Sequence, residues 1–182
     1  MMRSFNRIDT RSVREKQANE NVSEVDHAAE AAIIDTIHRA YPDHGILAEE
    51  SGQHNGNGFE WIIDPLDGTT NYLHSFPNFC VSIALRDRGR LESAVIYDPL
   101  HNEMFIASRG QGALLNDRRL RVSNPKSLEG ALLGTGVPFG SHQPYLETHS
   151  EMLKDMAKDT AGIRCAGSAA LNLAYLAAGR ID

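Results

Sequence analysis

Two carboxylates, Asp64 and Asp67, stand three residues apart after a short apolar run, in the stretch W-I-I-D-P-L-D-G-T-T-N at 61–71. Pro65 lies between them, and because it has a fixed φ and no N–H, the chain is expected neither to extend the strand nor to start a helix there. Both acids can therefore converge on one hard cation, since Mg²⁺ prefers oxygen ligands. Backbone N–H groups from Gly68 onward can cradle a phosphate if they open a helical turn. The pattern indicates a site for Mg²⁺ and a phosphate.

The same D-P-L-D-G sequence at 64–68 is also a good turn, with proline at a favoured position and a glycine free to adopt positive φ. A second pair of acids favours the cation site over a plain turn. Glu49 and Glu50 follow another apolar run, G-I-L-A at 45–48. If the two runs form neighbouring parallel strands, Glu49 and Asp64 lie at one edge of the sheet, where open α/β sheets bind ligands.

Hydrophobic periodicity predicts the elements that carry these residues. A helix capped by Ser23 is expected to run to about residue 40, where Pro42 ends it. The segment 51–58, which contains three glycines, is expected to be a mobile loop. Further strands are expected at 79–85, 93–97, 103–108, 113–115, 130–134 and 162–165, and further helices at 145–158 and 169–178. The last helix is apolar on nearly every face and so belongs in an interior, with Gly179 as its C-terminal cap.

Composition bounds the class of protein. The chain has 182 residues, of which 41% are hydrophobic and 23% charged, as in an ordinary globular domain. Its net charge of −6 argues against nucleic-acid binding through bulk charge. A local basic cluster is best explained as the solvated face of a hairpin, and it consists of Arg109, Arg118, Arg119 and Arg121.

The cysteines and the apolar runs indicate the cellular compartment of the protein. Cys80 and Cys165 have no zinc-like spacing and lie in apolar surroundings, as expected for core thiols in a reducing compartment. The N-terminus lacks the apolar core of a signal peptide. No apolar run approaches the roughly 20 residues that span a bilayer. We expect a cytoplasmic protein without a membrane partner.

Five segments together resemble the inositol monophosphatase family. They are V-S-E-V-D-H-A-A-E at 22–30, I-L-A-E-E-S-G at 46–52, W-I-I-D-P-L-D-G-T-T-N-Y at 61–72, the region 96–113 with M-F-I-A-S-R-G-Q-G-A, and 162–182. The sequences of these segments are most similar to those of the bacterial, SuhB-like branch. The resemblance implies the layered αβα sugar-phosphatase fold of the α/β class, shared with fructose-bisphosphatases. It further implies a single domain over 1–182, mostly the family's N-terminal α+β part, with 162–182 starting the C-terminal α/β part.

The resemblance also implies a role for each site residue. Mg²⁺ would be held by Glu49, with Glu50 beside it, by Asp64, by the carbonyl of Leu66 and by Asp67. Catalysis would depend on Glu49 and on Thr69, whose hydroxyl would pair with Asp26 to help activate water. Substrate would contact Asp67, Gly68, Thr69, Thr70, Gly167, Ser168 and Ala169. In this chemistry a metal-activated water attacks the phosphate, so no nucleophilic side chain is required.

The chain also departs from the family pattern. In the family, a substrate-binding glutamate and a tryptophan–aspartate motif that completes the second metal site follow the position of Asp182. Neither is present here, and Trp61 is the only tryptophan. The family's first long helix is also cut short at Met1. We therefore expect a fold that is incomplete at both ends, with weak or no phosphatase activity and poor stability.

Two further questions stay open on the sequence. The D-G-T-T-N wording favours inositol monophosphate over the substrates of fructose-bisphosphatases and bisphosphate nucleotidases, but another small phosphomonoester is possible. The resemblance also implies lithium sensitivity and a homodimer when full length. The alternative function is non-catalytic: proteins of the SuhB-like branch act with the transcription antitermination machinery, which the basic cluster could contact.

Overall fold

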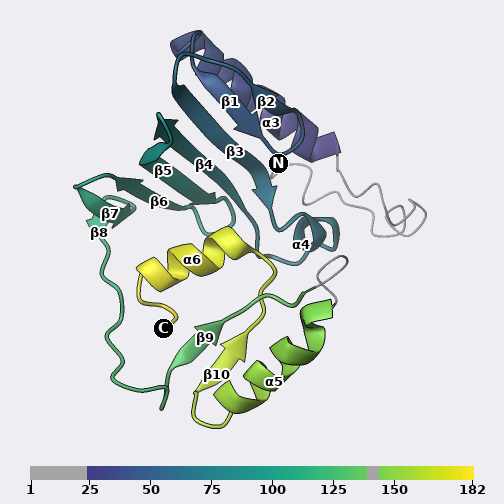
Figure 1. The fold of residues 1–182 in the computed structure, drawn as a ribbon, viewed down its shortest axis with the longest axis vertical. Coiled ribbons are helices and arrows are strands. Elements are labelled where there is room, and N and C mark those ends of the chain that lie inside the picture. The colour runs from purple at the N-terminus through teal and green to yellow at the C-terminus, as the bar shows by residue number, and fades with distance from the viewer. Residues whose placement is uncertain (1–23, 139–143) are drawn as a thin grey trace.

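The computed structural model describes residues 24–138 and 144–182, which form a large mixed sheet with helices on both faces (Figure 1). Neighbouring strands follow the order β2-β1-β3-β4-β5-β6-β7-β8. These strands are β1 (Gly45–Ala48), β2 (Gly52–His54), β3 (Phe59–Asp67), β4 (Cys80–Asp87), β5 (Arg90–Asp98), β6 (Glu103–Ser108), β7 (Gly112–Leu115) and β8 (Arg118–Arg119). A separate parallel pair joins β9 (Leu132–Gly134) to β10 (Gly162–Arg164). The helices are α3 (Glu24–Ala40), α4 (Thr69–Leu73), α5 (Leu146–Met156) and α6 (Ala169–Ala177).

Helix α3 covers one face of the sheet near β1 and β3. Three isoleucines at helical spacing, Ile33, Ile34 and Ile37, pack against buried Ile46 of β1 and Ile63 of β3. This apolar contact fixes the helix beside the carboxyl ends of the two strands, where the predicted acids follow.

Helix α6 covers the opposite face. Along β5, Ile96 packs with the α6 core whereas its neighbour Val95 lines a groove beside α3, as the alternation of side chains along a strand requires. Leu171 and Ala174 are the buried residues of α6 in that core. The predicted layered αβα fold is therefore confirmed. Leu173 is 65% exposed, however, so α6 is not buried on every face in the described residues.

A glycine and an arginine fasten the end of α6. Gly179 adopts a φ of +68° and ends the helix as predicted. The Arg180 guanidinium forms a bidentate ion pair with Glu103 of β6 and lies over the rings of Phe105 and Tyr175, 5.8 and 5.0 Å from their centroids. The hydrogen bonds from Arg180 lower the pKa of Glu103.

Strands β1 and β3 are parallel neighbours, with Ala48 opposite Ile63. Glu49 and Asp64 are the next residues on the two strands, and the Glu49 N–H donates to the Ile63 carbonyl at 3.1 Å. The prediction that these acids lie at one edge of a sheet is confirmed.

The prediction that Pro65 ends the strand is wrong. Strand β3 continues to Asp67, which pairs with Cys80 of β4 after a bulge between Asp64 and Asp67. Proline is tolerated at a bulge because the ladder needs no N–H there. The two acids are therefore carried by a bulged strand end and not by a free loop.

Other differences are local. The segment 51–58 is not wholly a loop, because β2 pairs antiparallel with β1, placing Gly52 opposite Ala48. Cys80 is buried as predicted, but Cys165 is exposed because it lies in the connection between β10 and α6. Strands β4 to β7 and helices α3, α5 and α6 confirm the predicted order, although the Ser23 cap lies outside the described residues. None of the described helices has the length and hydropathy needed to cross a bilayer.

Candidate active site

The carboxyl ends of β1 and β3 carry three carboxylates, Glu49, Asp64 and Asp67, which we call the acid cluster. Burial, and then the negative charges of Glu49 and Asp67, raise the pKa of Asp64 from 3.8 to about 7. A side-chain hydrogen bond with Glu49 also favours the protonated form of Asp64. The three groups repel one another when all are ionised, and a bound cation would relieve that repulsion.

The turn that follows Asp64 is held by its own hydrogen bonds. The Leu66 N–H donates to Oδ1 of Asp64, and the Thr69 hydroxyl donates to the Leu66 carbonyl, both at 3.0 Å. That carbonyl keeps a second lone pair, which suits the predicted metal-ligand role of Leu66. The Thr69 hydroxyl has one proton, so it must turn away from Leu66 before it can donate to Asp26. The pairing of Thr69 with Asp26 stays a prediction.

Gly68 allows the chain to turn from β3 into α4. Its φ is +98°, and a Cβ there would lie 2.9 Å from the Asn78 carbonyl oxygen and 3.2 Å from Cβ of Phe79. Both the conformation and the close contact therefore require glycine. Helix α4 begins at Thr69, so the helical turn that a phosphate cradle requires is present. Phosphate binding by Gly68, Thr69 and the exposed Thr70 stays a prediction.

Asp67 joins the end of β3 to the start of α6. Its Oδ2 accepts hydrogen bonds from the Ser168 hydroxyl at 2.5 Å and the Ala170 N–H at 2.7 Å, and its Oδ1 accepts from the Ala169 N–H at 3.3 Å. A carboxylate is stabilised at the first turn of a helix by the unpaired amides there. The structure thus brings the predicted segment 167–169 to the acid cluster. Ser168 is 1% exposed and orients Asp67, so its predicted contact with substrate remains untested.

Asn71 is a site residue that the sequence reasoning missed. Its Nδ2 donates to the carbonyls of Asn78 and Ala166, both at 2.7 Å. Gly167 has a φ of +79°, and a Cβ there would lie 2.8 Å from the same Nδ2. Asn71 therefore fixes the backbone immediately before Ser168. The asparagine in D-G-T-T-N was the available signal, but its Ala166 partner lies 95 residues further along the chain.

Glu30 is the second missed residue. It lies four residues after Asp26 on α3, and the two side chains are 3% and 1% exposed. The two carboxylate oxygens of Glu30 accept hydrogen bonds from the Glu50 and Ser51 N–H groups, each at 2.9 Å. Burial, then the charge of Glu49, then that of Asp26, raise the pKa of Glu50. Two acids four residues apart on a helix were the signal, since such residues share a face.

The donor set suits a hard divalent cation such as Mg²⁺. The acid cluster and the Leu66 carbonyl supply only oxygen, which Mg²⁺ prefers. Across residues 24–138 and 144–182, no three His, Cys, Asp or Glu side chains are arranged so that they could hold a metal ion without moving. Asp67 is engaged with α6, although each of its oxygens has more than one lone pair. The chemistry fits, and side chains of the acid cluster must adjust to close on a cation.

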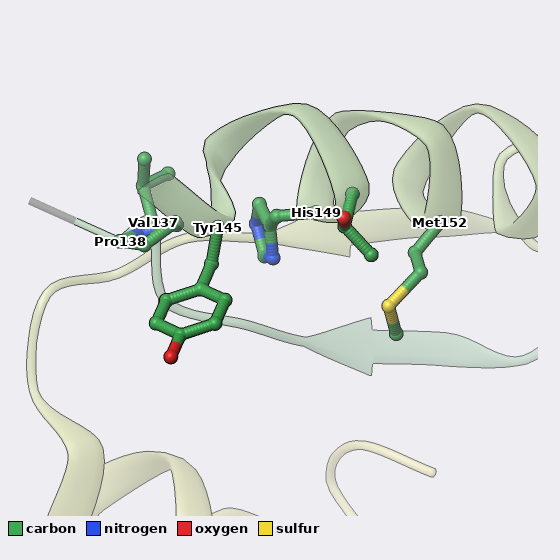
Figure 2. A pocket seen from close by; sticks show the side chains of 7 residues that line it. Val137, Pro138, Tyr145, His149 and Met152 are labelled. Atoms are coloured by element: carbon green, nitrogen blue, oxygen red, sulfur yellow. The ribbon is translucent and has the colours of Figure 1, made fainter. Parts of the chain in front are cut away.

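An open pocket of about 400 Å³ lies elsewhere, between α5 and the chain that follows β9 (Figure 2). Val137, Pro138, Tyr145 and Met152 make its lining mostly apolar and aromatic. The buried Nε2 of His149 has no hydrogen-bond partner among the described residues. None of these side chains was predicted to carry chemistry.

The fold agrees with comparisons to known proteins. The chain belongs to the inositol monophosphatase family, whose model matches residues 1–182. It is 54% identical over 187 residues to Nus factor SuhB of Pseudomonas aeruginosa, covering 100% of this chain and 69% of that protein. Nus factor SuhB of Escherichia coli K12 is 49% identical over 182 residues, covering 99% of this chain and 68% of that protein.

Solved structures give the same result. The extragenic suppressor protein suhB from Bartonella henselae matches with a TM-score of 0.88 and 43% identity, covering 99% of this chain and 71% of that one. Inositol monophosphatase from Anabaena matches with a TM-score of 0.81 and 43% identity, covering 90% and 65%. The predicted resemblance to the family, including its SuhB-like branch, is confirmed.

Proposed function

We propose that the acid cluster binds Mg²⁺ and that the protein hydrolyses a phosphomonoester, inositol monophosphate. The observation that carries this proposal is the position of Glu49 and Asp64 at the ends of adjacent parallel strands, with Asp67 near enough to raise the pKa of Asp64. Membership of the family supports the phosphatase class, and the name of the Anabaena relative supports the substrate.

Each residue of the proposed cation site has its own role. A bound Mg²⁺ would supply two effects, a lower pKa of a water molecule and stabilisation of the leaving alkoxide. The acid cluster and the Leu66 carbonyl would hold the cation. Glu49 is exposed, so its carboxylate can accept a proton from water on the open side of the cluster. Asp67 keeps the start of α6 against the site through Ser168.

A phosphate-release assay on the 182-residue chain tests this function. We expect weak, Mg²⁺-dependent release of phosphate from inositol monophosphate, faster than from other small phosphomonoesters in a substrate panel. Asp64→Asn should abolish it, and Asp35→Asn, the same change at an exposed position of α3, should not. Release that is independent of Mg²⁺, or that persists in Asp64→Asn, would contradict the assignment.

A second function is favoured by the names of the bacterial relatives. Two of them are called Nus factors, and this supports a contact of this protein with the transcription antitermination machinery in the cytoplasm. The basic cluster offers a surface for it: Arg118 and Arg119 form the short edge strand β8 and are exposed, as is Arg121. Arg109 is paired with Glu92 instead.

Two variants separate this function from catalysis. In a pull-down with RNA polymerase and Nus factors, the double change Arg118→Ala and Arg119→Ala should lower recovery of the protein while leaving phosphate release intact. Asp64→Asn should do the reverse. Equal recovery of the wild-type chain and the arginine variant would argue against the basic cluster as the contact.

A further inference from the structure

Glu30 reaches across from α3 to the chain that leaves β1. One carboxylate oxygen accepts the Glu50 N–H and the other accepts the Ser51 N–H, each at 2.9 Å. Hydrogen bonds to an ionised carboxylate are shorter and stronger than those between neutral groups. Because the two oxygens of Glu30 bind two successive amides, Glu30 fixes the direction of the backbone directly after Glu49.

The other side of this short segment is fixed by the sheet. The Glu49 N–H donates to the Ile63 carbonyl at 3.1 Å, which extends the pairing of β1 with β3 by one residue. Glu49 is thus held between a hydrogen bond to β3 and the two that its next neighbours give to Glu30. Its side chain is exposed, and apart from the hydrogen bond with Asp64 its direction depends on this backbone.

We propose that Glu30 is a positioning residue of the cation site, which aims Glu49 at Asp64 by holding the Glu50 and Ser51 amides. This inference rests on the proposed function, in which Glu49 and Asp64 hold Mg²⁺. Glu30 is not itself a ligand, because it is 3% exposed and both of its oxygens are engaged by the backbone. Groups that orient metal ligands in this way typically contribute about 10- to 100-fold to metal affinity.

A purely structural role for Glu30 makes a different prediction. If Glu30 only attached α3 to the sheet, its replacement would lower the melting temperature without changing the affinity of the folded protein for Mg²⁺. If it acted only through its negative charge, a replacement that keeps the charge would keep the affinity. Glu30→Gln removes the charge and one acceptor, whereas Glu30→Asp keeps the charge and shortens the reach by one methylene.

The experiment measures two quantities on the wild-type chain and three variants. Calorimetric titration with Mg²⁺ at pH 8 gives the dissociation constant, and amide hydrogen exchange reports the protection of the Glu50 and Ser51 N–H groups. Glu24→Gln is the matched control, because Glu24 is an exposed glutamate on the same helix. Protection of the Ile63 amide shows whether each variant is folded, and Glu30→Asp carries the test if Glu30→Gln does not fold.

We expect Glu30→Gln and Glu30→Asp each to raise the dissociation constant about tenfold or more and to speed exchange at Glu50 and Ser51, while Glu24→Gln changes neither. Affinity within twofold of wild type in Glu30→Asp overturns the inference, whatever Glu30→Gln does. A wild-type chain that binds no Mg²⁺ instead overturns the proposed function, and with it this role of Glu30.

Discussion

Replacing Asp64 by asparagine should stabilise the Mg²⁺-free protein at high pH. The unfolded carboxyl titrates near 3.8 and the folded one near 7, so between these values the folded state holds the additional proton. Stability from Asp64 therefore falls as the pH rises through this window and stays low above it. The full difference corresponds to about 4 kcal/mol. Because Asp64 is only half-buried, solvent screening reduces it to about 1–2 kcal/mol.

Asparagine resembles the protonated acid closely. Its Oδ1 can accept the Leu66 N–H, and its Nδ2 can donate to Glu49 as the protonated carboxyl does. For a chain of this length, 1–2 kcal/mol corresponds to about 2–8 °C in melting temperature. We expect the Asp64→Asn variant to melt that much above wild type at pH 8 in EDTA, with little difference at pH 4.

Thermal unfolding followed by circular dichroism from pH 4 to 8, with EDTA or with excess Mg²⁺, provides the assay. Excess Mg²⁺ should raise the wild-type melting temperature at pH 8 more than at pH 5, because the ligands must be deprotonated, and should leave Asp64→Asn unchanged. The control is Asp35→Asn on the exposed face of α3. A variant no more stable than wild type at pH 8 in EDTA would refute the account of the acid cluster.

Three other changes test the surroundings of the site. Asn71→Ala removes two hydrogen bonds to partly buried carbonyls, including that of Ala166, and should cost about 1–3 kcal/mol in urea unfolding as well as lowering phosphate release. Gly68→Ala should cost at least about 1–2 kcal/mol in the same measurement, because of its positive φ and the close contact at Cβ. Arg180→Ala should cost about 1 kcal/mol at pH 7, since the ion pair with Glu103 is partly exposed. The part of that cost due to the ion pair should disappear as the pH falls below 4.5, where Glu103 becomes protonated in the unfolded state and then in the folded state.

Matched variants control for each change. Asn124→Ala and Arg90→Ala alter exposed residues of the same types. Gly89→Ala has a φ of +86° with no atom within 4 Å of the added Cβ, so it separates backbone strain from the contact made at Gly68. Equal losses in Gly89→Ala and Gly68→Ala would show that the contact with Asn78 contributes nothing. If Arg180→Ala loses the same amount of stability at pH 3 as at pH 7, the ion pair is excluded as the cause of the loss.

The sequence predicted the elements whose signals are local. Periodic apolar residues located α3, β4 to β7 and α6 because the same residues form the buried faces. The end of β3 was mispredicted because a bulge opposite Cys80 accommodates Pro65, and a bulge depends on the partner strand. Strand β2 was missed for the same reason: G-Q-H has little strand preference and is ordered by pairing with β1.

The site residues also divide into those predicted from local signals and those that depend on distant partners. The acids of the cluster were predicted because they follow apolar runs, and the parallel pairing of those runs could be inferred. Asn71 and Glu30 were missed because their partners are backbone groups, which carry no side-chain signature in the sequence. The predicted contact of Ser168 with substrate stays a prediction, but the hydrogen bond from its hydroxyl to Asp67 was missed. Only the packing of α6 on the sheet brings those two residues together.

The link between Asp67 and the start of α6 has a consequence for the order of folding. Its hydrogen bonds join residues 101 to 103 positions apart, whereas the hairpins from β4 to β7 join near neighbours. Closing the longer loop costs more chain entropy, so it follows the hairpins in time. A refolding chain should therefore form its sheet before its site. The recovery of phosphate release should follow the docking of α6 and come later than the initial hydrophobic collapse of the chain.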